Sequence, residues 1–348
     1  MAYTTINKST DYFRTKTFTG NGTNDTAITW DESSNMQPDF LWFKNRDETQ
    51  SHALFDAVRG ADKRLISNSN GAEGTEATNL DSFDTNGFTV DNELIVNGSG
   101  DEMVTWGWKA GGSGSANTDG AVSTTVSVNT TAGFSIVKYT GTGTTTNFGH
   151  GLGVKPNVIL IKSLSTNDWV MNGDFLGSTT WQHKIILNTT AAKATANNFN
   201  DQAPTNSVFY LNFNHGTTNG SGNDYIAYCF AEKTGYSKFG SYTGNGNNDG
   251  TFVYTGFKPA FVMSKISSGT DNWLISDNKR LGYNEKNQQL FPNLSNAEQT
   301  SVRYDLYSNG FKVVNNNGEI NTSGATYIYM AFAEAPLVGT NNVPCTAR

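Results

Sequence analysis

The chain has 348 residues and a formal net charge of −7. Charged residues make up 16% of the chain, and 36 of the 348 residues are glycine. This length favours two or three domains. Asn, Thr, Ser and Gly fill most polar positions and have low helix propensity, so the composition predicts an all-β protein. Its only basic clusters are short, such as those at 62–64 and 278–280, and we therefore expect no nucleic-acid partner.

The N-terminal stretch MAYTTINKSTDYFRTK lacks the apolar segment of a signal peptide. No other stretch approaches the roughly 18 apolar residues of a membrane span. We expect no secretory export and no membrane insertion. The two cysteines, Cys229 and Cys345, lie in an apolar run and in the C-terminal tail, and we expect both to remain free thiols.

One order of landmarks occurs three times along the chain. Each copy opens with a glycine-rich turn: FTGNG from Phe18, YTGTG from Tyr139 and YTGNG from Tyr242. A proline and an apolar run ending in lysine follow: PDFLWFK from Pro38, PNVILIK from Pro156 and PAFVMSK from Pro259. A small-residue turn then precedes a closing strand: NGSG from Asn97, NGSG from Asn219 and NTSG from Asn321. Each copy is about a hundred residues long, which is the size of a domain.

Within each copy the pattern predicts short strands. HALFDAVRG at 52–60 leaves a helix open, because its apolar residues have mixed spacing, but its counterparts from Trp169 and Trp273 favour a strand leading into a turn. TNGFTVD at 85–91 and SNGFKVV at 308–314 each predict an Asn-Gly turn with a short strand. In the closing strands, bulky residues alternate with smaller ones, as Val104, Trp106 and Trp108 do with Thr105 and Gly107. This alternation indicates one face in a core and another that is closely covered.

These elements predict an all-β fold of three tandem antiparallel β-sandwich domains, with a jelly roll as the favoured topology. The expected organisation is an N-terminal arm at 1–12, repeat one at 13–110, a Gly/Ser/Thr-rich linker at 111–131, repeat two at 132–234, repeat three at 235–336 and a C-terminal tail at 337–348.

The glycine-rich openings invite a phosphate-loop reading, but each runs into another strand instead of a helix. We interpret them as turns that need a positive φ. The four histidines show no metal-ligand spacing, and we expect them at the surface. We predict no catalytic, cofactor or metal-binding residues. Calcium binding by NNDG at 247–250 or NTDG at 117–120 stays an open alternative, but neither stretch completes an EF-hand loop.

Two kinds of side chain remain as site candidates. The aromatic residues suggest carbohydrate stacking, and Trp181 and Tyr283, in polar loop-like stretches, are the candidates for exposed aromatic residues. The carboxylates Asp56, Asp277, Glu232 and Glu334 recur at related positions in the copies. Paired carboxylates could hydrolyse a glycan, but repetition in several copies favours a shared turn or buried contact.

Four phrases together resemble a repeat family in virion proteins of marine tailed bacteriophages: MAYTTINKSTDYF, HALFDAVRGADKRLISN, GSYTGNGNNDGTFVYTGFKPAFVM and TYIYMAFAEAPLV. The resemblance covers nearly the whole chain. It implies a tail-fibre or structural protein with concanavalin-like, lectin-like β-sandwich repeats, and it brings no catalytic residues and no cofactor. It also implies a virion location, with assembly in the host cytoplasm.

The function expected from this reading is a non-enzymatic tail-fibre or host-recognition adhesin that binds a cell-surface glycan or protein. The alternatives are a capsid decoration or appendage protein with a structural role and, less favoured, a glycan hydrolase. The expected partners are other virion proteins of the tail or capsid and a host glycan. Docking is assigned to the N-terminal arm or the C-terminal tail, and analogy with fibres suggests a homotrimer.

Overall fold

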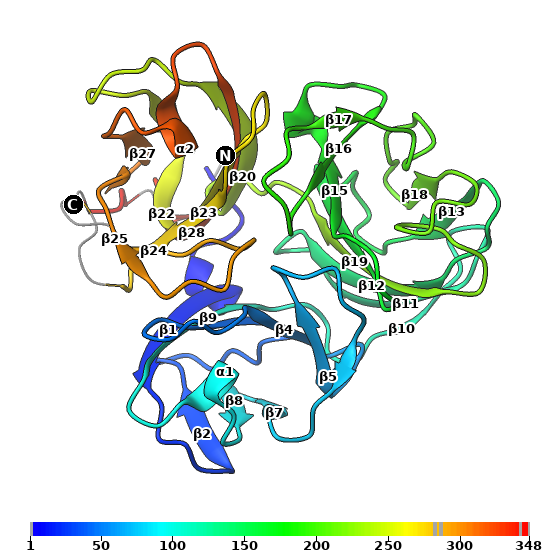
Figure 1. The fold of residues 1–348 in the computed structure, drawn as a ribbon, viewed down its shortest axis with the longest axis horizontal. Helices are drawn as coiled ribbons and strands as arrows, with labels where there is room; N and C mark the ends of the chain where they lie inside the picture. The colour runs from blue at the N-terminus through cyan, green and yellow to red at the C-terminus, as the bar shows by residue number, and fades with distance from the viewer. Residues whose placement is uncertain (1–2, 281–283, 285–287, 341–342, 347–348) are drawn as a thin grey trace.

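The computed structural model of the chain describes residues 3–280, 284, 288–340 and 343–346. Strands contain 43% of its residues and helices 4%, and the strands form several antiparallel sheets. The predicted all-β, antiparallel β-sandwich class is therefore confirmed. Figure 1 shows the strands in three groups around a common centre, and each group corresponds to one repeat of the sequence.

Repeat one has an inner sheet and a smaller outer sheet. The inner sheet runs in the spatial order β1 (Phe13–Thr19), β9 (Glu102–Trp108), β3 (Phe40–Asn45), β4 (Ala53–Asp56), β5 (Gly60–Ile66) and β6 (Gly74–Thr75). The outer sheet runs in the order β2 (Thr26–Thr29), β8 (Gly87–Val90) and β7 (Leu80–Asp84). The strand at 53–56, its following turn and the hairpin at 80–90 confirm the predictions for these segments.

Repeat two follows the same plan. Its inner sheet runs in the order β10 (Ser115–Asn117), β11 (Thr124–Asn129), β12 (Phe134–Thr140), β19 (Asp224–Phe230), β14 (Val158–Ser163), β15 (Val170–Gly173), β16 (His183–Ile186) and β17 (Ala194–Thr195). The outer pair is β13 (Thr146–Gly149) and β18 (Val208–Leu211). Segment 111–131, expected to be a loose linker, contains β10 and β11, which extend the sheet beyond β12.

Repeat three contains the remaining strands. Its inner sheet runs in the order β20 (Ser237–Thr243), β28 (Thr326–Pro336), β22 (Phe257–Ile266) and β23 (Trp273–Asp277). Its outer sheet runs in the order β21 (Phe252–Tyr254), β27 (Gly310–Val313) and β26 (Tyr304–Tyr307), and a short pair consists of β24 (Gln288–Gln289) and β25 (Gln299–Thr300).

The helical elements of the described residues are single turns: η1 (Ser9–Asp11), α1 (Leu94–Asn97), η2 (Asp174–Leu176) and α2 (Gly318–Asn321). Within the described part of the chain, none is long and apolar enough to cross a membrane. α1 and α2 occupy corresponding places, because each ends at the asparagine of a small-residue turn.

The glycine-rich opening and the small-residue turn of each repeat are bound to each other. Gly22, Gly143 and Gly246 have φ values of 65°, 70° and 71°, which confirms the predicted positive-φ turns. Their amides donate to the main-chain carbonyls of Asn97, Asn219 and Asn321 at 3.0, 3.1 and 3.0 Å. These hydrogen bonds join the glycine-rich turn of each repeat to its small-residue turn.

Each repeat has its own core between its two sheets. The smaller side chains of the closing strand line this core, for example Ala227, Cys229 and Ala231 in repeat two. In repeat one the ring of Trp30 lies over Gly107, where an added Cβ atom would come within 2.7 Å of the indole. The predicted close covering of this face is confirmed.

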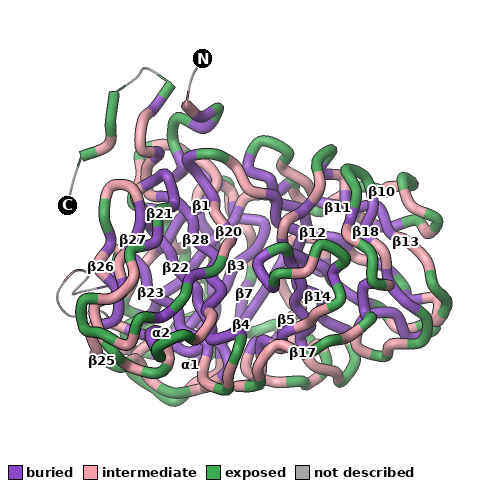
Figure 2. The backbone as a smooth tube through the Cα atoms, turned by 90° about the horizontal axis from the view of Figure 1, so that it is seen from above, coloured by how far each residue is buried: buried purple, intermediate pink, exposed green. Residues whose placement is uncertain are grey.

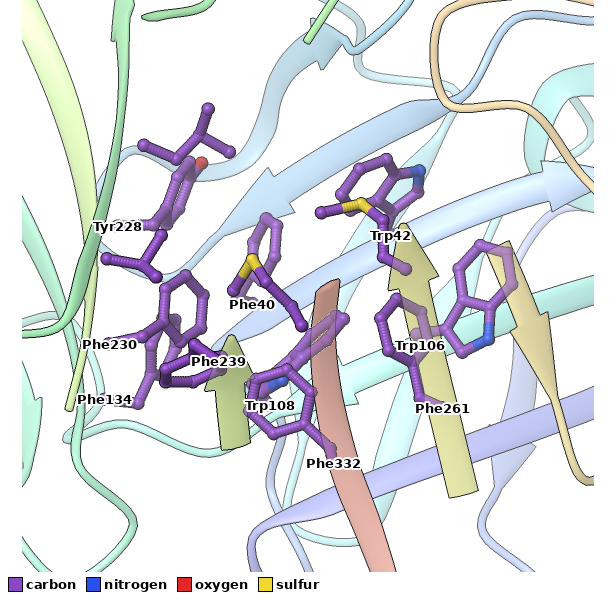
Figure 3. Close-up of a cluster of buried hydrophobic side chains, with 14 of the residues drawn as sticks. Phe40, Trp42, Trp106, Trp108, Phe134, Tyr228, Phe230, Phe239, Phe261 and Phe332 are labelled. Carbon is purple, nitrogen blue, oxygen red and sulfur yellow. The ribbon is translucent and has the colours of Figure 1, made fainter. Parts of the chain in front are cut away.

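The bulky face of each closing strand points into one further core, which all three repeats share. Rings from different repeats meet there: Phe40 and Tyr228 have centroids 4.5 Å apart, Trp108 and Phe332 5.5 Å, and Phe230 and Phe332 5.9 Å. Figure 3 shows these rings in one cluster between the inner sheets. Phe40, Trp108, Tyr228, Phe230 and Phe332 are all 5% exposed or less, so the repeats pack as one body.

The N-terminal arm is part of this packing. Thr4 and Ile6 are buried, Ile6 within the shared core, and the ring of Tyr12 contacts Tyr236 of repeat three. The Tyr3 hydroxyl donates to the Gly256 carbonyl at 2.8 Å. Figure 2 shows both ends of the described chain on the same side of the molecule, near β21. Residues 3–12 therefore pack against repeat three and the shared core before the chain enters β1.

Two of the four histidines are not at the surface, contrary to expectation. His52 and His150 are fully buried. Trp42 Nε1 donates to His52 Nδ1 at 2.9 Å, and burial lowers the pKa of His52 well below its usual value. A buried imidazole without a carboxylate partner stays neutral, so this histidine is a packing residue between strands.

Candidate functional site

The outer sheet of repeat three has an aromatic face toward solvent. In β21, Phe252 and Tyr254 are 44% and 55% exposed, whereas Val253 between them is buried in the core of the repeat. In β26, Tyr307 is 37% exposed and its neighbour Leu306 is buried. Period-2 alternation places Phe252, Tyr254 and Tyr307 on the same side of the sheet. These three residues are called the aromatic surface below.

The pairing of the strands brings the three rings together. Gly310 of β27 lies directly between Tyr254 and Tyr307 in the sheet. The ring of Phe252 extends over this glycine, because a Cβ atom at position 310 would lie 3.0 Å from Phe252 Cζ. The centroids of Phe252 and Tyr307 are 6.0 Å apart, with the rings at 73°. The glycine leaves the space that the Phe252 ring occupies.

Polar groups surround the aromatic surface. The Tyr307 hydroxyl donates to Asp305 Oδ2 at 3.4 Å. The Lys312 ammonium is paired with Asp249, and this hydrogen bond raises the pKa of Lys312. The Tyr3 hydroxyl lies beside Tyr254, and burial together with that neighbour raises the pKa of Tyr3 to about 12. All of these hydroxyl and charged groups can hydrogen-bond a ligand placed on the rings.

The other two repeats lack this surface. The pairing registers match Phe252 with Ala27 in repeat one and Asn147 in repeat two. They match Tyr254 with Thr29 and Gly149, and Tyr307 with Asp84 of repeat one. Because the same outer sheet forms with small or polar residues at these positions, the fold does not require aromatic side chains there.

Neither of the two aromatic candidates from the sequence belongs to this surface. Trp181 is fully buried, where its ring contacts Phe199 and its Nε1 donates to Asp174 Oδ1 at 3.0 Å. The prediction that Trp181 is exposed is wrong, because the polar loop folds back and the indole completes the core of repeat two. Tyr283 lies outside the described residues.

A signal for the aromatic surface was present in the sequence. Aromatic residues at alternating strand positions usually pack in a core, so the general pattern does not single out Phe252 and Tyr254 as exposed. Val253, however, occupies the inward phase of that alternation. A position-by-position comparison of the three copies would have singled out the aromatic residues that only one copy contains.

The recurring carboxylates are held by neighbouring side chains. Asp56 Oδ2 accepts from Arg59 Nε at 2.5 Å and Asp277 Oδ2 from Arg280 Nε at 2.7 Å, and both carboxylates are buried. Glu232 pairs with Lys238 and Glu334 with Lys258. Among the described residues, no group of three or more His, Cys, Asp or Glu side chains is arranged to hold a metal ion.

Comparison with curated proteins and with solved structures finds no match. One family model matches residues 8–336, which include all three repeats. The chain therefore belongs to the family described as "Domain of unknown function (DUF7483)".

Proposed function

We propose that the protein is a carbohydrate-binding adhesin of a bacteriophage particle, in which the aromatic surface of repeat three holds the glycan. The observation that carries this proposal is the exposure of Phe252, Tyr254 and Tyr307 on one face of a sheet whose counterparts in the other repeats are small or polar. It is a binding function, and no bond-breaking step is assigned to these residues.

The chemistry of a sugar ring suits this surface. The C–H groups on one face of a pyranose carry partial positive charge and pack against the electron-rich face of an aromatic ring. The hydroxyl groups around the sugar then need hydrogen-bond partners, and Asp305, Lys312 and Asp249 lie on the same sheet or beside it. Aromatic stacking with a polar rim would supply both needs.

The size of the surface favours a glycan over a protein partner. Three partly exposed aromatic side chains offer roughly a few hundred Å², whereas a stable protein interface buries about 800 Å² on each partner. The area of the three aromatic side chains is enough to contact two or three sugar rings. A polysaccharide with repeated units would then gain affinity through many copies on one particle.

The particle setting rests on the sequence resemblance to virion proteins of marine tailed phages. On the same basis we propose that each repeat is a jelly-roll unit of the concanavalin-like, lectin type. The packing of residues 3–12 against repeat three makes the N-terminal arm a poor docking segment, so in this proposal residues 337–348 dock the protein to its virion partners.

The test is binding to purified host surface polysaccharide and to a glycan array, with the unaltered chain and with Phe252→Ala, Tyr254→Ala and Tyr307→Ala. Each substitution is expected to weaken binding about tenfold or more, equivalent to about 1.4 kcal/mol. The matched control is Phe213→Ala, which removes an aromatic side chain of repeat two that is 62% exposed and is expected to leave binding unchanged.

Three results would contradict the proposal. Equal loss of binding in the Phe213 variant would show that the aromatic surface is not the site. Absence of glycan binding, together with location of the chain at symmetric capsid positions in a virion map, would favour the structural decoration protein. Release of oligosaccharides during incubation would instead require a hydrolase.

A further inference from the structure

A hollow of about 350 Å³, lined by both polar and apolar side chains, lies between repeats three and one, away from the outer sheet of the aromatic surface. Its walls come from η1 and β1 on one side and from β22, β28 and the turn after β23 on the other. The lining residues are Thr10, Phe13, Arg14, Thr15, Glu32, Ala260, Asn278, Lys279, Ala333 and Glu334. Pockets of about this volume hold small molecules.

Three buried oxygen atoms of the lining residues have no hydrogen-bond partner among the residues that the structure describes. They are Thr15 Oγ1, Glu32 Oε2 and Asn278 Oδ1. Thr15 is only 4% exposed, so bulk water does not replace the missing partner. A buried acceptor without a donor is destabilising, and a ligand that donates to it removes this penalty.

The neighbouring groups determine which kind of ligand can fit. Asn278 Nδ2 donates to Glu334 Oε2 at 2.5 Å, so the Asn278 amide presents its oxygen to other donors. The Glu32 carboxylate lies 3.6 Å from Arg14 Nε and 3.6 Å from Lys279 Nζ. These ion pairs balance the charge of Glu32 at distances too long for hydrogen bonds. The hollow therefore accepts hydrogen bonds and carries little net charge.

The two corresponding junctions are filled with apolar side chains. By strand register, Thr15 corresponds to Ile136 in repeat two and Phe239 in repeat three. Lys279 corresponds to Val58 and Phe175, each the second residue after the end of its strand. Ile136, Phe239 and Phe175 belong to the shared core, and Val58 packs against it. Only the junction of repeats three and one has a hydroxyl and an ammonium at these two positions.

We propose that this hollow is a second binding site, which takes a neutral polyhydroxylated molecule such as a single hexose unit. The hydroxyl groups of the ligand donate to Thr15, Glu32 and Asn278, while Phe13, Ala260 and Ala333 contact its carbon skeleton. A strongly charged ligand is disfavoured, because the carboxylates of Glu32 and Glu334 and the cationic groups of Arg14 and Lys279 line the same hollow. The site does not depend on the aromatic surface.

The test uses the full chain with Phe252, Tyr254 and Tyr307 all changed to alanine, so that the aromatic surface cannot contribute. Saturation-transfer NMR and calorimetry measure binding of glucose, galactose, mannose and glycerol, with inorganic phosphate and ethylamine as charged comparisons. At least one neutral polyol is expected to bind, and both charged probes at least tenfold more weakly. Comparing a hexose with an oligosaccharide of the same sugar distinguishes a free monosaccharide from a chain end.

Substitutions copied from the other junctions provide the matched variants. Thr15→Ile and Lys279→Val place in this hollow the side chains found at the junction of repeats one and two, and each is expected to weaken polyol binding at least tenfold. Their melting temperatures are expected to stay the same or rise, which shows that they fold. Glu32→Met, which removes both acceptor oxygens at a partly exposed position, is the fallback if either fails to fold, with the same expected loss.

Failure of every neutral polyol to bind would overturn the site, as would unchanged affinity in Thr15→Ile or, where the fallback is needed, in Glu32→Met. Either outcome leaves the proposed function intact, because the aromatic surface is absent from this background. Conversely, polyol binding in the hollow, without glycan binding by the aromatic surface of the unaltered chain, would contradict the proposed function and leave the second site standing.

Discussion

The hydroxyl group of Tyr228 in repeat two donates a 2.8 Å hydrogen bond to Oδ2 of the buried Asp56 in repeat one. The same oxygen accepts from Arg59 Nε. At the junction of repeats three and one, Trp106 Nε1 occupies the place of the Tyr228 hydroxyl and donates to Asp277 Oδ2 at 3.1 Å. Two of the three junctions in the shared core are thus bridged by a hydrogen bond to a carboxylate that is paired with arginine.

The third junction has neither partner. At this junction, between repeats two and three, Gly173 stands where the other junctions have the carboxylate, and Met330 stands where they have its donor. Phe175 of the adjacent η2 enters the shared core. A buried charge without a partner is costly, so the loss of the acceptor together with its donor keeps this junction free of unpaired groups.

Breaking the buried pair at the first junction is expected to destabilise the protein strongly. Asp56→Asn leaves the Arg59 charge in the interior without its nearest anion, and such changes cost about 3 to 5 kcal/mol. Urea unfolding measures the difference. Asp31→Asn, at a half-exposed carboxylate paired with Lys16 and Lys279, is the control and is expected to cost less than about 1 kcal/mol. Similar costs for both variants would contradict the assignment.

Stability is expected to rise between about pH 8 and pH 10. Burial lowers the pKa of Lys44, Lys162 and Lys265 to about 8, from an ordinary value of 10.5. In that window the unfolded chain binds more protons than the folded one, so the free energy of unfolding increases with pH. Above pH 10 the trend reverses, because burial raises the pKa of tyrosines such as Tyr236 and only the unfolded chain ionises them.

Urea unfolding at pH 7.5 and pH 9.5 measures this dependence, and Lys162→Met tests its origin. The substitution removes one of the lysines whose pKa is lowered by burial and is expected to reduce the increase in stability between the two pH values. Lys238→Met, at a lysine side chain that is 42% exposed, is the control and is expected to leave the increase unchanged. A flat or falling profile in the unaltered chain would contradict the prediction.

The asparagine that joins the two turns of repeat three is expected to be essential for its stability. Asn321 Nδ2 donates to Asn247 O at 2.7 Å and to Asn315 O at 2.9 Å, and its Oδ1 accepts from Asn245 N at 2.8 Å. Asn321→Ala leaves these groups without their partner and is expected to cost at least about 2 kcal/mol. Asn92→Ala, at an exposed position, is expected to change stability by less than about 0.5 kcal/mol. Thermal unfolding of both variants is the measurement, and equal melting temperatures would refute the role of Asn321.

The N-terminal arm is expected to stabilise the molecule. Ile6 is 1% exposed in the shared core, and Ile6→Ala is expected to cost about 2 to 5 kcal/mol through the cavity it leaves. Limited proteolysis should then cut the arm faster than in the unaltered chain. Thr5→Ala, at the exposed neighbouring residue, serves as control. An arm that contributes nothing would show equal cutting rates for both variants.

Much of the local structure could be predicted from the sequence. Strand alternation at Val104, Trp106 and Trp108, the proline-led central strands and the Asn-Gly hairpins all depend on neighbouring residues alone. The glycines at 22, 143 and 246 were readable as turns for the same reason. Trp181 was misjudged because its burial depends on how a loop folds back onto a sheet, and no neighbour in the sequence reports that.

The sequence by itself determined the β-strands, their turns and the threefold repetition, because alternation, propensity and turn chemistry are local properties of the chain. Only the tertiary structure decided that the bulky faces of the three repeats enter one shared core, which joins residues as distant as Trp108 and Phe332. It also decided that the alternation in β21 turns Phe252 and Tyr254 outward and that Thr15 faces a hollow, since burial depends on what packs across a face. Both proposed sites lie where one repeat departs from the other two, at positions that repetition alone leaves unassigned.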